Sequence, residues 1–289
     1  MSENRKAVQA MLAAGLLWTV MEVSASFFVG HYSAFQVVWL RYAVHLLLMF
    51  LVWGWREPSR LWITKRPLFQ LGRSMLMVGM PAAWIFGTRL GVTTSEMLWF
   101  FWLSPIILLL IAWCFLQELV PRFVWIVTGL GCAGALLLLR PTIQSPLHLL
   151  LLPFAMGLCF AAYVAMTRSL RTEDRRANLF YTAFGVYIAL TPLMARVWIT
   201  PLPRDVPLFL AIGVLGFFGL YAIDVGAAAA PVSIGAAAFY VQLVLVTAVA
   251  AIVANQEPIG LAWAGILLLS ISVACAWVRA PHLRVLEAK

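Results

Sequence analysis

The feature that most constrains this chain is a succession of apolar runs, each long enough to cross a lipid bilayer. A helix needs roughly 20 apolar residues to span a hydrocarbon core about 30 Å thick. Such runs fill nearly all of the 289 residues and leave only short connections between them. The composition agrees, because only 11% of the residues are charged, whereas a soluble domain averages about 25%. We therefore predict an all-α integral membrane protein.

The apolar runs predict ten transmembrane helices with no room for a separate soluble domain. The predicted spans are 7–29, 33–53, 68–87, 94–116, 122–140, 147–167, 178–199, 207–226, 234–254 and 260–279. A cleaved signal peptide is the alternative for the first run, which follows Arg5 and Lys6 and contains the letters VSAS. The length of this run and the Glu22 inside it favour a retained span.

The Lys and Arg residues lie mainly in the connections, and their distribution predicts the orientation of the chain. Positive residues gather on the cytoplasmic side of membrane proteins. With the N-terminus inside, the inner connections and tails hold fourteen of them, and the outer connections hold four. We therefore predict that both termini are cytoplasmic. The net charge of +9 then reflects orientation, and no nucleic-acid partner is expected.

Two stretches of the chain resemble each other at a separation of 139 residues. Gln117 and Gln256, Glu118 and Glu257, and Arg140 and Arg279 are paired at this spacing. The repeat unit would then hold five helices, so the second copy runs through the membrane in the opposite sense. We predict a first repeat at 1–141 and a second, inverted repeat at 142–289, an arrangement typical of secondary transporters. Chance matching in a sequence of low diversity is the alternative.

Glu22 and Arg41 are charges inside the first two apolar runs, at similar depth below the outer surface. An isolated charge at the bilayer centre costs about 2.5–3.5 kcal/mol on insertion scales, so both should face protein or a water-filled cavity. The short connection predicts that the two helices are neighbours and that an ion pair is easy to form. Two hypotheses stay open: a static pair that pins the hairpin, or a pair that lines a substrate path.

Other polar and aromatic residues in the spans are candidates for a substrate-binding site, each with a packing alternative. Trp18 shares a helix face with Glu22, while His45 lies one turn below Arg41. Arg73 can instead snorkel to the inner interface, and both Glu96 and Asp224 lie where solvation is easy. We expect Glu118 and Glu257 to bond helix ends. The predicted binding residues are Glu22, Arg41, Trp18, Trp102, Trp99, Glu96, Tyr163, Tyr240, Gln242, His45 and Arg73.

Metal and catalytic sites are not indicated by the sequence. The four cysteines lie inside apolar runs without a CxxC or a Cys/His cluster, so no metal, disulfide framework or cofactor is expected. An intramembrane enzyme would need a nucleophile–base pair or metal cluster at depth, and no HExxH, GxSxG or paired aspartates occur. A structural or sensory membrane protein is a further alternative class.

Several stretches together resemble the drug/metabolite transporter superfamily, in its ten-helix EamA-type branch. They are "LQELVPRFVW…LLLLRP", "NQEPIGLAW…AWVRAP", "VVWLRYAV" and "LSPIILLLIAWCFLQE". The resemblance implies two inverted five-helix repeats around a central cavity, in the cytoplasmic (inner) membrane of a bacterium, acting by alternating access. It also implies transport of small metabolites, most often outward. The charges at Glu22, Arg41, Arg73 and Glu96 are similar to those of a branch with S-adenosylmethionine, riboflavin and opine-metallophore carriers.

Our functional prediction is a monomeric exporter of a small zwitterionic or amino-acid-like metabolite. Arg41 would hold a carboxylate, and Glu22 an ammonium group or a coupling proton. The alternative is an uptake carrier for a larger organic metabolite such as S-adenosylmethionine or riboflavin. The second half lacks matching charges, since Val164 and Gly235 stand where Glu22 and Glu96 would recur. The charged part of the site is therefore expected on one side.

Overall fold

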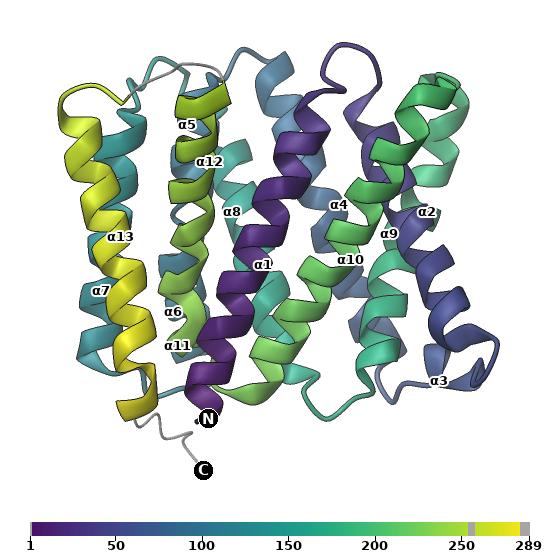
Figure 1. Cartoon of the computed structure of the whole chain (residues 1–289), viewed down its shortest axis with the longest axis horizontal. Helices are drawn as coiled ribbons and strands as arrows, with labels where there is room; N and C mark the ends of the chain where they lie inside the picture. Colours follow the sequence, from purple (N-terminus) through teal and green to yellow (C-terminus); the bar gives the residue numbers. More distant parts are fainter. Residues whose placement is uncertain (1, 254–257, 284–289) are drawn as a thin grey trace.

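The computed structural model describes residues 2–253 and 258–283, and every regular element within them is a helix. Most of the helices stand side by side in one bundle (Figure 1). The first half holds α1 (Glu3–Ser26), α2 (Ala34–Met49) with its π-helical extension η1 (Phe50–Gly54), α3 (Ser59–Trp62), α4 (Pro67–Arg89), α5 (Thr94–Phe101), α6 (Ser104–Cys114) and α7 (Arg122–Leu139). The second half holds α8 (Leu151–Ser169), α9 (Arg175–Val197), η2 (Pro203–Asp205), α10 (Val206–Ala229), α11 (Val232–Gly235), η3 (Ala236–Phe239), α12 (Tyr240–Val253), α13 (Leu261–Arg279) and η4 (Ala280–His282).

Local signals set the helix starts, which explains why the predicted boundaries lie within a few residues of the observed ones. Proline occupies the first turn of α4, α6 and α10, where its missing N–H costs nothing. The side chain of Asp174 accepts a 2.8 Å hydrogen bond from the backbone N–H of Arg176 and so caps α9. Thr93 and Glu96 form a capping box at the start of α5.

Nine helical segments of the described chain are long and apolar enough to cross a membrane. They include the discontinuous segments Thr94–Cys114 and Val232–Val253, which are broken by irregular turns between α5 and α6 and by η3. The helix α4 is 23 residues long but is not among the nine. Its composition explains this, because Gln70, Arg73 and Ser74 lower its hydropathy although all three are buried.

The helices pair mainly across the two halves of the chain. The closest associations are α1 with α10, α4 with α8, α2 with α9, and α7 with α13. In the order of the predicted repeats, α1, α2, α4 and α7 correspond to α8, α9, α10 and α13. Exchanging every helix for its counterpart turns the α1–α10 pair into α8–α4 and leaves the other two pairs as they are, so the set of pairs is unchanged. The α7–α13 pair stands at one edge of the bundle and the α2–α9 pair at the other (Figure 1).

The prediction that the first two spans are packed against each other is wrong. α1 packs against α10 and α12, while α2 packs against α9 and α10. The helix α10 therefore lies between them, as the view in Figure 1 also shows. Glycines make this possible. A Cβ at Gly216 would stand 2.9 Å from Nε of Arg41, and a Cβ at Gly219 would overlap the indole of Trp18.

The small residues of the fifth and tenth spans bring α7 and α13 together. A Cβ at Gly134 would stand 2.8 Å from the carbonyl oxygen of Gly265, and one at Gly265 would stand 2.7 Å from that of Gly134. The two backbones are thus in direct contact at this crossing. Small residues commonly permit such an approach between membrane helices, where van der Waals packing stabilises association.

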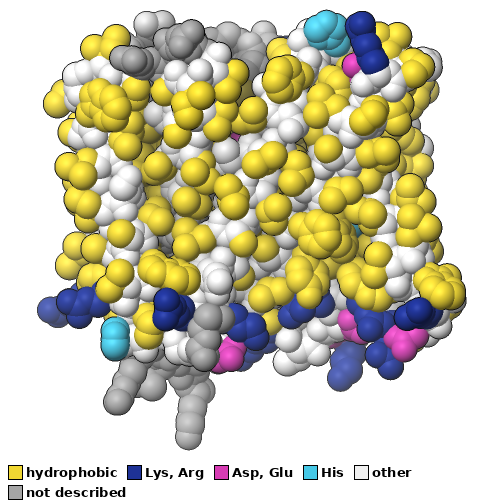
Figure 2. All heavy atoms as spheres, in the orientation of Figure 1, with side chains coloured by type: hydrophobic (Ala, Val, Ile, Leu, Met, Phe, Trp, Pro, Cys, Tyr) yellow, Lys and Arg dark blue, Asp and Glu magenta, His cyan; other side chains and the backbone are white. Residues whose placement is uncertain are grey.

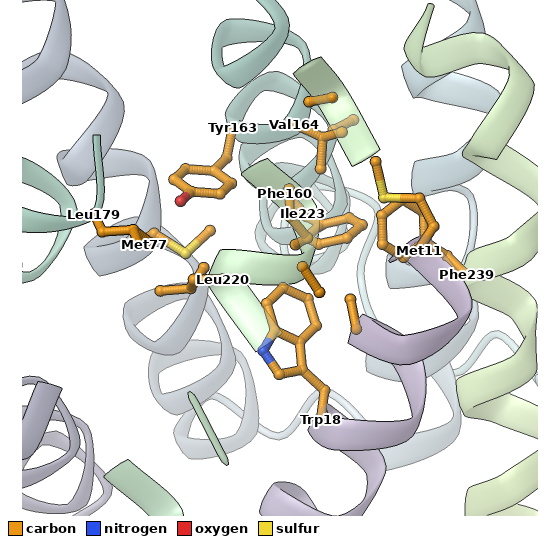
Figure 3. Close-up of a cluster of buried hydrophobic side chains, with 14 of the residues drawn as sticks. Met11, Trp18, Met77, Phe160, Tyr163, Val164, Leu179, Leu220, Ile223 and Phe239 are labelled. Atoms are coloured by element: carbon orange, nitrogen blue, oxygen red, sulfur yellow. The ribbon is translucent and has the colours of Figure 1, made fainter. Parts of the chain in front are cut away.

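The bundle has a large apolar cluster in its interior and one strongly basic end. Figure 3 shows apolar and aromatic side chains from several helices, including Trp18, Phe160 and Phe239, packed in one cluster. On the face drawn in Figure 2, an apolar band occupies the middle and most Lys and Arg residues gather where α1 begins. We call this the basic end. The helix α13 also ends there (Figure 1).

Candidate functional site

The polar face predicted on α1 is present, and its carboxylate is tied to the second half of the chain. Gly15 and Trp18 are buried, whereas Glu22 is exposed. Oε2 of Glu22 accepts a hydrogen bond of 2.9 Å from Nε2 of Gln242, which is only 3% exposed. A Cβ at Gly15 would lie 2.6 Å from a methyl group of Val241, so α1 and α12 approach closely just below the bond. Two predicted binding residues therefore meet.

The expected ion pair between Glu22 and Arg41 does not form among the described residues. Nη2 of Arg41 instead donates a 3.0 Å hydrogen bond to the hydroxyl of Tyr42, and its guanidinium lies 4.7 Å from the centre of that ring. Nε of Arg41 is buried without a hydrogen-bond partner in the described chain. Glu22 and Arg41 therefore do not neutralise each other by direct contact.

Trp18 begins a chain of aromatic contacts that joins α1 to both broken spans. Its ring lies 5.5 Å from that of Phe160, edge to face. Phe160 contacts Phe101 at 5.7 Å, and Phe101 contacts Trp102 at 5.2 Å. Phe101 and Phe160 were missed by the sequence reasoning, because a phenylalanine in an apolar run carries no polar signal.

The breaks in the two discontinuous spans meet at Trp102 and Tyr240. Trp102 follows the end of α5, and Tyr240 begins α12 directly after η3. The hydroxyl of Tyr240 donates a 3.4 Å hydrogen bond to the carbonyl oxygen of Trp102, and the two rings lie 6.1 Å apart. Irregular backbone at membrane depth is tolerated where protein or a cavity re-satisfies its polar groups. The two predicted residues are therefore brought together, and Gln242 lies two residues beyond Tyr240 on α12.

Glu96 is buried, which corrects the expectation that it is solvated at the outer mouth. Its Oε1 accepts hydrogen bonds from the backbone N–H groups of Gln144 and Ser145, at 2.8 and 3.0 Å. Its Oε2 accepts from Thr93 and from the hydroxyl of Ser145. Both oxygens are thus occupied in fastening the 144–145 connection to α5. Trp99, one turn further along α5, is half-buried and packs edge to face on Phe100 at 4.8 Å.

His45 is buried beside α10, apart from Glu22. Its ring lies 4.9 Å from that of Phe217, edge to face, and 6.1 Å from that of Tyr42. Nε2 of His45 has no hydrogen-bond partner in the described residues. These contacts agree with the packing role that the sequence reasoning weighed for this residue.

Arg73 does not snorkel to the interface, because it is fully buried in a polar network nearer the basic end. Its guanidinium donates hydrogen bonds of 2.8 Å to Thr167, 3.0 Å to Gln70 and 2.9 Å to Thr182, and one of 2.6 Å to the carbonyl oxygen of Asn178. Tyr163 joins this network, with its ring 5.0 Å from the Arg73 guanidinium. Two further predicted residues therefore lie together, away from Glu22.

Asp224 belongs to the same network and is buried, not solvated as expected. Its Oδ1 accepts a 3.0 Å hydrogen bond from Nδ2 of Asn178. Glu118 behaves as expected, since it accepts from the backbone N–H groups of Val232 and Ser233 at the start of α11. Its predicted counterpart Glu257 lies outside the described residues.

Two surface hollows of about 450 Å³ each are present, and neither is lined by the predicted binding residues. One is apolar and lies among α1, α12 and α13, with Trp277 in its wall. The other holds Arg89 and Arg196 where α4 and α9 end. Within residues 2–253 and 258–283, no group of three or more His, Cys, Asp or Glu side chains could hold a metal ion.

Comparison with known proteins assigns the chain to a family. Residues 5–140 match the EamA-like transporter family. The S-adenosylmethionine uptake transporter of Rickettsia prowazekii is 22% identical over 244 residues, which cover 83% of this chain and 81% of that protein. The predicted resemblance to the drug/metabolite transporter superfamily is thereby confirmed. This resemblance favours transport over intramembrane catalysis.

Other comparisons agree with this assignment to the drug/metabolite transporter superfamily. The S-adenosylmethionine uptake transporter of Rickettsia bellii is 24% identical over 229 residues, which cover 78% of this chain and 77% of that protein. A solved crystal structure, described only as that of a protein, matches with a TM-score of 0.80 at 18% identity. The match covers 96% of this chain and 98% of the chain in that structure. At this identity it shows the fold alone.

In a drug/metabolite transporter, the residues around α1 can bind a ligand that carries both charge signs. Of Glu22, Glu96 and Asp224, only Glu22 is exposed, so only its carboxylate is open to a cation. Arg41 supplies a guanidinium for an anion, while Trp18 leads into the aromatic chain towards Trp102 and Tyr240. Aromatic faces bind cations by cation–π attraction and planar rings by stacking.

Proposed function

We propose that the chain is a secondary transporter that takes up an organic metabolite with cationic, anionic and aromatic parts, S-adenosylmethionine being the first candidate. The sequence reasoning preferred export of a smaller amino-acid-like compound and kept this carrier as the alternative. The names of the Rickettsia relatives favour the alternative, in both substrate and direction. The experiments must distinguish this uptake from the export of a small amino-acid-like compound.

The observation that carries the proposal is the exposed carboxylate of Glu22 beside Arg41 and Trp18. S-adenosylmethionine has a sulfonium and an ammonium cation, a carboxylate and an adenine ring. Glu22, oriented by Gln242, is suited to a cation, and Arg41 is suited to the carboxylate. In our proposal the two halves part during transport and expose the aromatic chain from Trp18 to Tyr240, whose ring faces then bind the adenine and the sulfonium.

The pairing of helices supports two inverted repeats, 1–141 and 142–289, and transport by alternating access. The main pairs are kept when each span is exchanged for its counterpart, as expected of inverted repeats whose site lies between the halves. With α4 counted as a span, each repeat has five. The basic end then faces the cytoplasm with both termini, in a bacterial inner membrane, and we expect a monomer to be sufficient.

Uptake of labelled S-adenosylmethionine into proteoliposomes tests the proposal. We expect saturable uptake by the wild type, and a loss of at least tenfold in Glu22→Gln and Arg41→Ala. Glu3→Gln is the matched control, because it removes an exposed carboxylate at the start of α1, outside the site. Wild-type rates in both stably folded variants would show that the site is placed wrongly.

A thermal-shift screen tests the substrate class independently of transport. Ligand binding to the native state raises the apparent stability by mass action. We expect S-adenosylmethionine to raise the unfolding temperature of the wild type, and much less that of Glu22→Gln. If only small amino acids do so, and efflux from loaded vesicles exceeds uptake, the export hypothesis replaces this one.

A further inference from the structure

A second buried carboxylate lies outside the proposed binding site and has an unoccupied acceptor. Asp224 is 3% exposed, five residues before α10 ends near the basic end of the bundle. Its Oδ1 accepts the hydrogen bond from Asn178, while its Oδ2 is buried and has no partner among the described residues. Buried polar atoms in native proteins are nearly always hydrogen-bonded, so this oxygen needs an explanation.

The other acidic side chains at comparable sites do not share this feature. Both oxygens of Glu96 accept hydrogen bonds from the 93–96 and 144–145 segments. Both oxygens of Glu118 accept from the start of α11. Glu22 is exposed and faces the proposed substrate region. Asp224 therefore combines deep burial with a free acceptor oxygen.

The charge of Asp224 is balanced by Arg73 through Asn178. The carbonyl oxygen of Asn178 accepts from Nη2 of Arg73, and its side-chain amide donates to Asp224. A buried charge is costly unless it is paired, and two hydrogen bonds of Asn178 link the carboxylate of Asp224 to the buried guanidinium of Arg73. The titratable and charged groups around Asp224 are Arg73 of α4, Tyr163 and Arg168 of α8, Arg175 of α9, and Tyr221 of its own helix.

Two of the arginines around Asp224 are bound elsewhere as well. Arg175 donates to the hydroxyl of Tyr221 at 3.3 Å, and Arg168 donates to the carbonyl oxygen of Ala227 at 2.8 Å. The side that α1 presents to this part of α10 is apolar, with Ala10 and Met11 against Gly226. Arg73 is the fully buried cation that hydrogen bonds link to Asp224, through Asn178.

The helix α10 connects this cluster to the proposed substrate site. Gly219 and Gly216, which seat Trp18 and Arg41, precede Asp224 by five and eight residues on the same helix. At about 1.5 Å per residue, the carboxylate lies roughly 8 and 12 Å along the axis from these seats. Movement of α10 relative to α4 and α9 would thus shift the seats of both residues.

We propose that Asp224 is the site at which a proton binds to couple transport to the proton gradient; this rests on the proposed transport function. A proton from water forms an O–H bond at Oδ2, and the carboxylate becomes a neutral carboxyl group. Arg73 is then a buried cation without its counter-charge, which destabilises the packing of α10 on α4 and α9. The coupling proton is thereby assigned to Asp224, and Glu22 is left to the substrate.

The test compares gradient-driven uptake with exchange, in proteoliposomes that contain the full chain. Exchange of labelled for unlabelled S-adenosylmethionine requires substrate binding and the conformational change but no net proton movement. We expect Asp224→Asn to lose at least tenfold of the accumulation driven by an inward proton gradient, while its exchange stays within about twofold of wild type. Glu3→Gln, which removes an exposed carboxylate at the start of α1, should keep both activities. Asp224→Glu should recover gradient-driven uptake with a displaced pH dependence.

Each outcome decides one of the two proposals. If the folded Asp224→Asn variant accumulates substrate at the wild-type level under the proton gradient, the proton site is wrong. It is also wrong if uptake by the wild type does not depend on the gradient while exchange is intact. If Asp224→Asn fails to fold, an unchanged pH dependence in Asp224→Glu overturns it. Absence of both uptake and exchange in the wild type instead contradicts the proposed function itself.

Discussion

Glu22 of α1 and Gln242 of α12 are joined by a 2.9 Å hydrogen bond between residues 220 positions apart. Gln242 is buried, so its amide has little access to water and is committed to the carboxylate. The bond therefore fixes the direction of the exposed charge on α1 from the second half of the chain. Gln242 is a positioning residue for Glu22.

Replacing Gln242 by Leu should weaken substrate binding while leaving the fold intact. The hydrogen bond is made to a charged group, and such bonds contribute about 1.5–3 kcal/mol. We expect the KM for S-adenosylmethionine to rise at least tenfold, with a smaller effect on the maximal rate. Gln9→Leu removes an exposed amide from α1 and should have no effect; equal KM changes in the two variants would refute the positioning role.

Gly219→Ala should disturb the seat of Trp18. The new Cβ would overlap the indole nitrogen, and overpacking of this kind costs about 1–3 kcal/mol. We expect a lower unfolding temperature in detergent and slower uptake. The matched control is Gly72→Ala, because nothing lies within 4 Å of a Cβ at that position of α4. Equal behaviour of the two variants would contradict the close α1–α10 contact.

The positions of the helices could be predicted from the sequence because hydropathy and capping are local properties. The packing of the first two spans could not. The short 27–33 connection suggested neighbours, but Gly213, Gly216 and Gly219 let α10 enter between α1 and α2. Glycines in a span indicate close packing, yet they do not indicate which helix approaches.

Glu96→Ala should lower stability without changing the KM for substrate. The change leaves the backbone N–H groups of Gln144 and Ser145 without their acceptor, and hydrogen bonds to a charged group contribute about 1.5–3 kcal/mol. We expect a clear loss in the unfolding temperature of the purified protein. A large rise in KM with unchanged stability would instead return Glu96 to the binding site.

Acid sensitivity should report the ion pair between Glu57 and Arg176. The hydrogen bond from Arg176 lowers the pKa of Glu57 below its ordinary value of 4.5. The ionised form is favoured in the folded state, so this stabilisation is present above pH 4.5 and is lost as the pH falls through the lower folded value.

We therefore expect Glu57→Gln to be less stable than wild type at neutral pH and to approach it below pH 4. Unfolding temperatures measured across pH 3–7 check this. Arg176→Gln should produce the same change, and the double variant should add nothing. Fully additive losses would show that the two side chains act separately.

The candidate site was predictable only where a polar residue interrupts an apolar run. That signal found Glu22, Arg41, Gln242 and Arg73, but it could not assign their partners. Arg73 is held by groups from α4, α8 and α9, and no sequence pattern brings those three helices together. The snorkelling expectation for Arg73 was therefore wrong, although snorkelling is common for arginines at that depth.

The cross-pairing of the halves has a consequence for the order of biosynthesis. The main partner of α1 is α10, which is made about 180 residues later, at roughly 5–20 residues per second. Glu22 and Arg41 therefore lack their native contacts with Gln242 and α10 for on the order of ten seconds after their own helices are made. We expect the isolated residues 1–141 to be degraded or retained by the insertion machinery, and to be rescued when 142–289 is supplied as a second polypeptide.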